Sequence, residues 1–477
     1  MANSKYEYVK SFEVEDEIMP PNVIVVCVDG RDFQRFSEVH EFEKPYDMKA
    51  LELMNECAKA VIEQFPDIVF SFGFSDEYSF VFKKGTKFYQ RRASKIHSLI
   101  VSFFTSVYVA KWKEFLPQKD LRYAPSFRSR VICCASLEVL QAYLFWRQSE
   151  CHLKNQYDTC FWHLIKSGKT EREAEEMLKG TEKQVKNELL YHYFNINYRK
   201  DIPEIFRQGT CALKTEVEDI VKYKVDGCPV KRPRRKIITV HREYIASTEF
   251  WDKQPCLLKE LGQFTEDLSK AKVDYVRSFQ YESRLMPFTW IVIRIDGCHF
   301  HRFSDIHEFE KPNDAQALNL MNSCAAGVLE EFKDIVFAYG VSDEYSEIIS
   351  AVVSLFSSIY TMKWNALFPH KEMKYPPYFD GRVVCYPSSE ILRDYLAWRQ
   401  VDCHINNQYN TCFWMLVKSG KSKSEAQNYL KETKMVDGEE GSAGKSRKII
   451  VVKHCDIIET SFWEAHPYIL DEKRSGL

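Results

Sequence analysis

The hydrophobic positions near the start of the chain change from one periodicity to another. Val23–Val28 is a continuous run of apolar, mostly β-branched residues, which predicts a buried strand. From Asp47 onward, apolar residues recur at i, i+3, i+4 and i+7, which predicts an amphipathic helix with Asp47 as its N-cap. Ile68–Phe72 and Tyr78–Phe82 then predict two strands joined by a short turn. The predicted order is strand, helix and hairpin.

This pattern occurs twice. The sequence HEFEKP at His40–Pro45 recurs letter for letter at His307–Pro312, 267 positions later, and the turn sequence SDEYS recurs at the same offset. A later landmark, WRQ, begins at Trp146 and again at Trp398, only 252 positions later. The second copy has therefore lost 15 residues between these landmarks. Two copies with so long a period indicate a tandem duplication of a large domain, not a solenoid.

The composition agrees with two packed domains. Hydrophobic residues make up 45% of the 477 residues and aromatic residues 14%, which supports ordinary cores and excludes a mostly disordered chain. We therefore predict an α+β fold with two tandem domains, residues 1–265 and residues 266–477. Each is expected to have a strand–helix–hairpin core and added C-terminal helices, and the second is truncated.

Charge excludes few functions. Lys and Arg total 66 against 68 Asp and Glu, so the chain is no polycation, although a basic face would still bind nucleic acid. The basic run Lys231–Lys236 has three interpretations: a solvated loop, an RNA-contacting patch or a nuclear import signal. The most apolar stretches, 99–110 and 348–359, are short and interrupted by Ser and Thr, so we expect no membrane-spanning segment.

Acidic residues stand where the predicted strands end. Asp29 ends the first strand and precedes Gly30, and Asp76 and Glu77 stand at the hairpin turn, so we expect the carboxylates to lie close together. Mg²⁺ prefers oxygen ligands, usually one or two carboxylates with phosphate and water. The pattern indicates a magnesium site, and the alternative is that these are turn residues without a ligand. The second copy repeats the set at Asp296, Gly297, Asp343 and Glu344.

Basic residues follow the hairpin in the first copy. They are expected on a loop and on the first turn of a helix: Lys83, Lys84, Lys87, Arg91, Arg92 and Lys95. Cations beside carboxylates suit a triphosphate, and a solvated charged loop is the alternative. Further along, Arg147, His152 and Asn155 share a predicted helix. For His152 we expect either a packed structural residue or a contact to a phosphate or a base.

The motifs together resemble one known family. In the first copy they read DGRDFQRF from Asp29, HEFEKPYD from His40, SDEYSFVF from Ser75 and RRASK from Arg91, followed by WRQSECH and FNINY. Their identity and order resemble the tRNA-His guanylyltransferases. The resemblance covers nearly the whole chain, and the two tandem copies are similar to the plant enzymes.

The resemblance implies a palm-like domain with a ferredoxin-like βαββ core in each copy, similar to that of polymerases but adding nucleotides in the 3′-to-5′ direction. Such an enzyme uses ATP to adenylylate the 5′-monophosphate of tRNA-His, and the 3′-hydroxyl of GTP then attacks the activated end. Removal of pyrophosphate leaves a G at position −1. Two Mg²⁺ ions per active domain, ATP and GTP as substrates, tRNA-His as partner and self-association are implied as well. The nucleus is the implied location, with the cytoplasm as the alternative.

The resemblance also implies roles for individual residues. Catalysis is expected from Asp29, Asp76 and Glu77, and metal binding from Asp29, Gly30, Asp76, Asp296, Gly297 and Asp343. Nucleotide binding is expected from Asp29, Gly30, Arg31, Asp32, Phe33, Gln34, Ser75, Asp76 and Lys95, and in the second copy from Asp296, Gly297, Cys298, His299, Phe300, His301, Ser342 and Asp343. Handling and activation of the tRNA are expected from Arg147, His152, Asn155, Arg399, His404 and Asn407.

Both copies depart from the family pattern. The first has Cys27 and Gln34 where the second has Arg294 and His301, and the second lacks the basic loop with Lys95 and the FNINY segment. We therefore expect the first copy to be catalytic and the second to bind triphosphate poorly. The alternative is an RNA- or GTP-binding protein in which both copies have lost catalysis. A cyclase acting on free GTP is a third hypothesis.

Overall fold

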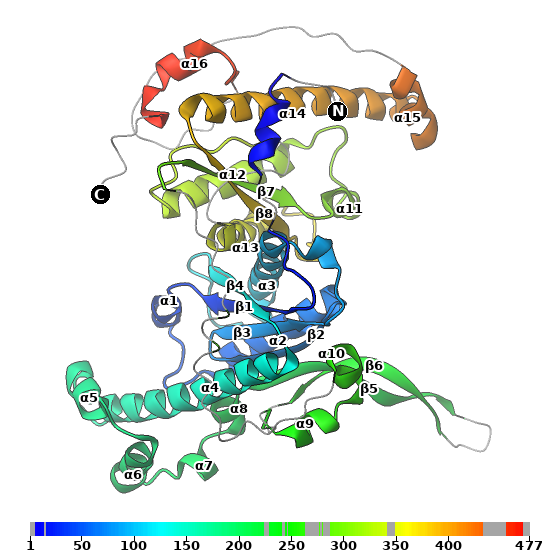
Figure 1. Ribbon diagram of the computed structural model, residues 1–477. Coiled ribbons are helices and arrows are strands. Elements are labelled where there is room, and N and C mark those ends of the chain that lie inside the picture. The colour runs from blue at the N-terminus through cyan, green and yellow to red at the C-terminus, as the bar shows by residue number, and fades with distance from the viewer. Residues whose placement is uncertain are drawn as a thin grey trace. The chain divides into compact units, whose positions relative to one another are not determined.

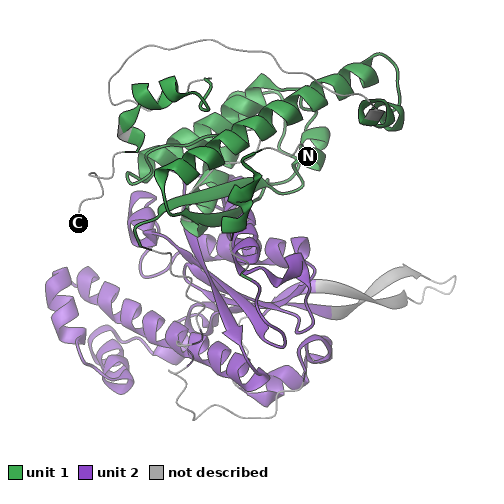
Figure 2. Cartoon of the chain, turned by 45° about the horizontal axis from the view of Figure 1, so that its top comes forward, with its two compact units in different colours: residues 1–16, 283–477 green, residues 17–282 purple. Residues whose placement is uncertain are grey.

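The computed structural model divides the chain into two compact units, residues 17–282 and residues 1–16 with 283–477 (Figures 1 and 2). The expected domain boundary after residue 265 lies outside the described residues. The structure describes residues 5–13, 16–223, 229–240, 244–245, 247–262, 276, 279, 287–340, 349–432 and 455–470.

The unit of residues 17–282 is built on one antiparallel sheet of six strands, in the order β4-β1-β3-β2-β5-β6. The three strands expected from the apolar runs are confirmed as β1, β2 and β3. The bounds are β1 Val23–Gly30, β2 Ile68–Phe74, β3 Glu77–Phe82, β4 Phe127–Cys134, β5 Thr210–Tyr223 and β6 Pro229–Val240. Central strands β1 and β2 are buried along almost their full length, because helices cover both faces of the sheet.

The predicted amphipathic helix is confirmed as α2, Met48–Gln64, and the Asp47 side chain accepts the Ala50 N–H as its N-cap. With α3, Ala93–Phe115, it covers one face of the sheet, where Tyr78 of β3 donates to Asn55. Helix α4, Leu137–Lys166, covers the other face through Tyr143 and its neighbours. The remaining helices are α1 Phe33–Val39, η2 Phe88–Arg91, α5 Glu171–Leu178, α6 Lys183–Phe194, α7 Tyr198–Asp201, α8 Glu204–Gln208, α9 Thr248–Asp252 and α10 Pro255–Leu261.

Helix α3 alone, among the described residues, is long and apolar enough to cross a membrane. Of its most apolar window, 78% is buried inside the protein, as in the core helix of a folded domain.

The basic run Lys231–Lys236 lies within β6. In the register with β5, Lys231 lies opposite Ile220 and Lys236 lies opposite Thr215. The solvated-loop interpretation is therefore wrong, because the backbone of this run belongs to a regular antiparallel ladder. The interpretations as an RNA-contacting patch and as an import signal stay predictions.

The unit that contains residues 283–477 has a two-stranded antiparallel sheet, β7 Trp290–Gly297 and β8 Phe379–Tyr386. Residues 335–340, which correspond to β2, form no strand. The 15 missing residues include the continuation of the return strand, which removes part of the partner that a strand at 335–340 would need. The helices are η1 Glu7–Phe12, α11 Phe300–Ile306, α12 Ala315–Glu331, α13 Ile349–Leu367, α14 Ser389–Lys418, α15 Lys423–Glu432, α16 Thr460–Ala465 and η4 Pro467–Ile469.

Gly73 in β2 allows the hairpin to pack. A Cβ added to Gly73 would lie 2.4 Å from the ring of Tyr78, which is fully buried and has no room to move. We expect Gly73→Ala to lower the free energy of unfolding by about 1–3 kcal/mol, because overpacking forces strain into the core. Gly85→Ala is the matched control, since its Cβ would meet nothing within 4 Å. Urea unfolding of both variants checks this, and equal stabilities would contradict it.

Candidate functional site

The carboxylates of the first copy converge at one end of the central strands. Antiparallel pairing of β1 with β3 places Asp29 directly opposite Glu77, and the Gly30 N–H donates to the Asp76 carbonyl over 3.1 Å. The side chains of Asp29, Asp76 and Glu77 are 13%, 23% and 18% exposed. The structure therefore brings together the acidic residues that the sequence predicted, at a partly open edge of the sheet.

Every one of these carboxylates contacts a cationic side chain. Asp29 pairs with Arg128 at 2.8 Å and with Arg130 at 3.4 Å, both from the neighbouring strand β4. Asp76 pairs with Lys154 of α4 at 3.3 Å. The remaining carboxylate, Glu77, contacts Arg147 of α4 and lies 3.9 Å from Arg130. Four cations thus contact three carboxylates, and cations of this kind suit a polyphosphate.

Helix α4 supplies one row of these charges, since Arg147, Lys154 and Asp158 are spaced for one helical face. Burial alone would lower the pKa of Lys154, but the charges of Asp76 and Asp158 raise it, so Lys154 stays protonated. Burial raises the pKa of Asp158 above its usual value. Burial and the charge of Glu77 raise the pKa of the Cys27 thiol on β1 to about 12. The thiol donates a hydrogen bond to the Glu77 carboxylate.

The predicted nucleotide residues lie around this edge but point in different directions. Gly30 is needed for packing, because an added Cβ would lie 2.4 Å from the Phe33 ring. Ser75 has a left-handed backbone, with φ at 53°, and its hydroxyl donates to Asp76. By contrast, Gln34 donates to Glu38 on its own helix. The two remaining residues of this run form an ion pair, with the Arg31 Nε 3.7 Å from Asp32, which precedes α1.

The basic loop is partly structural. Arg91 is 5% exposed and donates to the backbone carbonyls of Ile18, Thr86 and Asn22, so it holds the loop together. Two lysines of the loop have contacts of their own: Lys83 pairs with Asp67 at 2.8 Å, and the Lys95 ammonium lies 4.9 Å from the centre of the Tyr89 ring.

His152 is packed between helices. Its ring meets the Tyr198 ring edge-on, with centroids 5.3 Å apart, and the Tyr198 hydroxyl donates to Asn155 over 2.9 Å. Burial lowers the pKa of His152 to about 4, so the ring is neutral at pH 7. These contacts favour the structural interpretation of His152, and its role in handling tRNA stays a prediction.

In the second copy, the structure describes the first-strand side of the arrangement. In the register of β7 and β8, Asp296 lies opposite Asp380 and Gly297 lies opposite Phe379. An aspartate therefore stands where the first copy has Arg128. Asp380 is 3% exposed. Residues Ser342, Asp343 and Glu344 lie outside the described residues. The other predicted nucleotide residues, Cys298, His299, Phe300 and His301, occupy the same turn and helix start as in the first copy.

The tRNA residues of the second copy are more open. Arg399 is 8% exposed and lies 3.4 Å from Asp402, whereas His404 and Asn407 are exposed on α14. Asn407 accepts a hydrogen bond from Asn313 over 3.0 Å. The difference has a physical cause, because the second copy has no counterpart of the FNINY segment, whose Tyr198 covers His152 and Asn155.

The donor set of the first copy fits Mg²⁺. Asp29, Asp76 and the Gly30 carbonyl are hard oxygen ligands, as this ion prefers. Over the described part of the chain, no group of three or more His, Cys, Asp or Glu side chains is placed to hold a metal. A Mg²⁺ site usually takes one or two carboxylates and completes its shell with phosphate and water.

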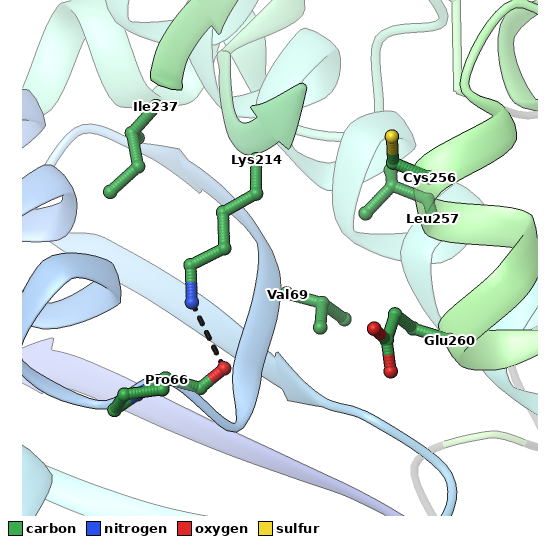
Figure 3. A pocket seen from close by; sticks show the side chains of 7 residues that line it. All are labelled: Pro66, Val69, Lys214, Ile237, Cys256, Leu257 and Glu260. Carbon is green, nitrogen blue, oxygen red and sulfur yellow. Dashed lines mark hydrogen bonds between the residues drawn. The ribbon is translucent and has the colours of Figure 1, made fainter. Parts of the chain in front are cut away.

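A separate pocket of about 290 Å³ lies near the start of β2, away from the turn that carries Asp76 (Figure 3). The side chains of Val69, Ile237 and Leu257 make much of its wall, and the Lys214 ammonium is bound to the carbonyls of Pro66 and Ile68. Because its one cation is already bonded and its lining is largely apolar, this pocket is a poor site for a triphosphate.

Sequence reasoning did not predict Arg128 and Lys154 as partners of the carboxylates. Their contacts depend on the pairing of β4 with β1 and on the position of α4, which local periodicity does not reveal. The available signal was the difference between the copies, since the second has Asp380 and Asn406 at these positions.

Arg147 and Lys154 are expected to differ in their effect on stability. The Arg147 side chain is 8% exposed, so Arg147→Met leaves Glu77 without its closest cation and should lower the free energy of unfolding by about 3 kcal/mol. The Lys154 side chain is 49% exposed, so Lys154→Met should cost about 1 kcal/mol or less. Urea unfolding of the two variants measures both, and equal losses would contradict the assignment.

The lowered pKa of His152 predicts a pH dependence. Between pH 6.5 and about pH 4 the unfolded chain binds a proton at this position and the folded chain does not, so stability falls as the pH falls through this window. His152→Gln should remove part of that loss, as measured by the urea midpoint against pH. His404→Gln, at the equivalent exposed position, is the control and should keep the wild-type profile. A His152→Gln profile identical to wild type would contradict the prediction.

Comparison with known proteins identifies the family of the chain. The tRNAHis guanylyltransferase family model matches residues 6–135, and again 273–350 and 346–387, and the model of the Thg1 C terminal domain matches 138–250 and 390–441. Two relatives from Arabidopsis thaliana, tRNA(His) guanylyltransferases 1 and 2, are 60% and 57% identical over 98% of this chain and 91% and 99% of their own. The crystal structure of the Saccharomyces cerevisiae enzyme is 44% identical over 43% of this chain and 92% of its own, with a TM-score of 0.42. The chain therefore belongs to the tRNA(His) guanylyltransferase family of nucleotidyltransferases.

Proposed function

We propose that this protein adds a guanosine to the 5′ end of tRNA(His), and that the reaction takes place at the strand-end carboxylates of the first copy. The observation that carries the proposal is the convergence of Asp29, Asp76 and Glu77 on an intact hairpin, next to Arg128, Arg130 and Lys154. Family membership supplies the substrate class.

In the proposed reaction an oxygen of the tRNA 5′-phosphate attacks the α-phosphorus of ATP, so that a P–O–P bond forms and pyrophosphate leaves. The 3′-hydroxyl of GTP then attacks the activated 5′-phosphorus, and AMP leaves. Hydrolysis removes pyrophosphate from the added nucleotide and leaves the G at position −1. The net result is one phosphodiester bond built in the 3′-to-5′ direction.

The residues of the site have complementary parts in this scheme. Asp29, Asp76 and the Gly30 carbonyl would hold two Mg²⁺ ions, which activate a hydroxyl and neutralise a leaving pyrophosphate when bound. The side chains of Arg128 and Lys154 are 58% and 49% exposed. They can therefore turn from the carboxylates toward the phosphate oxygens of a bound nucleotide. The buried Arg147 fixes the Glu77 carboxylate beside the metal ligands.

We also propose that each half carries a palm-like core and that the second copy serves as a partner surface for the first. The family models match both halves, which supports the duplication. The first half keeps the hairpin strands β2 and β3, whereas the corresponding described residues 335–340 of the second form no strand. We propose a nuclear location, supported by the basic run Lys231–Lys236 and the family.

The activity test uses 5′-monophosphorylated tRNA(His), ATP, GTP and Mg²⁺, and the product is one nucleotide longer. We expect Asp76→Ala to reduce it to below about 1% of wild type, because a metal-binding carboxylate and its transition-state stabilisation are lost. Asp343→Ala, the equivalent change in the second copy, should spare most of the activity. The reverse pattern would show that the second copy is catalytic.

One observation favours a second candidate function. Arg128 occupies the position opposite Asp29 where the second copy has Asp380, and a bound guanidinium competes with a metal ion. Under this alternative the first copy binds nucleotide or RNA without turnover. Isothermal titration with GTP and Mg²⁺ discriminates, since binding without a longer tRNA product supports the alternative.

A further inference from the structure

The two copies share a short segment ahead of their first strands. The sequence YVKSF at Tyr8–Phe12 recurs as YVRSF at Tyr275–Phe279, at the same 267-residue offset as the strand-end aspartates. Each segment therefore belongs to its own copy by sequence. Their positions in the two compact units do not follow this order.

The segment of the first copy packs in the unit of the second. Helix η1 lies against α14 and β8 (Figure 1), and Val9 is fully buried in a core that includes Tyr386 and Trp398. The Phe12 ring meets the Tyr386 ring edge-on at 5.6 Å, and the Lys10 ammonium lies 5.2 Å from the centre of the Trp398 ring. Figure 2 shows residues 1–16 within the unit of residues 283–477.

The segment of the second copy packs in the unit of the first. Val276, the counterpart of Val9, is 2% exposed and belongs to the core that contains Tyr143 and Trp251. Phe279, the counterpart of Phe12, packs against the same core. Each copy therefore fills an apolar position in the unit of the other, and the two exchanges are reciprocal.

The exchanged segment also brings a charge. The Glu13 carboxylate lies 3.1 Å from the Arg382 guanidinium and 3.6 Å from that of Arg294. These arginines face each other across β7 and β8, two positions from the facing pair Asp296 and Asp380. Like charges directly opposite on a sheet destabilise the pairing, and Glu13 neutralises them.

The first copy provides the comparison within the same chain. The counterparts of Glu13, Arg294 and Arg382 are Gln280, Cys27 and Arg130, so the acidic residue and one arginine are lost together. Where Arg382 pairs with Glu13, Arg130 pairs with Asp29 and lies 3.9 Å from Glu77. Glu13 therefore lies against the strand pair that carries two facing arginines.

We propose that the two copies exchange their N-terminal segments, and that Glu13 of the first copy is a positioning residue that bridges Arg294 and Arg382 beside the strand-end aspartates of the second. The unit that holds residues 283–477 is then incomplete without the first sixteen residues of the chain. This holds whichever copy carries the nucleotidyl transfer.

The exchange is tested with the matched variants Val9→Ala and Val276→Ala in the full-length chain, by hydrogen–deuterium exchange and mass spectrometry. Val9→Ala should speed exchange in peptides of β8 and α14 by about fivefold or more and leave β1 and α4 unchanged. Val276→Ala should do the opposite. Effects confined to each segment's own copy would overturn the exchange.

The role of Glu13 is tested by rescue. Glu13→Gln should speed hydrogen exchange in β7 and β8, because Arg294 and Arg382 then lose the carboxylate that they share. Adding Arg294→Cys, the residue of the first copy, should restore protection toward wild type. Glu7→Gln, which removes an ion pair with Lys10 in the same segment, is the control and should leave β7 and β8 unchanged. Equal effects of Glu13→Gln and Glu7→Gln, or additive effects without rescue, would overturn the assignment.

Discussion

The antiparallel pairing of β1 with β3 is the constraint on which the candidate site depends. It places Asp29 opposite Glu77 and ties the Gly30 N–H to the Asp76 carbonyl, so residues almost fifty positions apart share one edge. The same ladder turns one face of β1 toward α4, from which Arg147 and Lys154 reach the carboxylates. Without the hairpin of β2 and β3, the acidic residues would be three unrelated turn residues.

The two copies have diverged around this constraint in complementary ways. The first keeps the full ladder and surrounds its carboxylates with cations from β4 and α4. In the described residues of the second, β7 pairs with β8, an aspartate stands in place of Arg128, and the Glu13 carboxylate lies between two facing arginines. Exchange of the N-terminal segments couples the stability of each unit to the sequence of the other copy.

Local pattern predicted the elements of the first copy well. The apolar run at β1, the N-cap at Asp47 and the hairpin strands follow from periodicity and turn chemistry alone. The convergence of Asp29 with Asp76 followed as well, because it needs only neighbouring strands.

Other features depend on contacts between distant segments. The pairing of Arg128 with Asp29 requires the register of β4, and the burial of His152 requires Tyr198 from α7. A solvated loop was one of the three interpretations of the basic run in β6, whereas pairing with β5 makes the run part of a strand. The packing of Val9 in the unit of residues 283–477 could not be predicted from the residues around Val9. The only sign of it in the sequence is the repeat of YVKSF as YVRSF.

Crystals grown with GTP and Mn²⁺ in place of Mg²⁺ test the central claim most directly, because manganese is located by its anomalous scattering. The account predicts a peak within coordination distance of Asp29 and Asp76, with Arg128 and Lys154 moved from these carboxylates onto the phosphates. Manganese at Asp296 alone, with the Arg128–Asp29 pair intact, would contradict it.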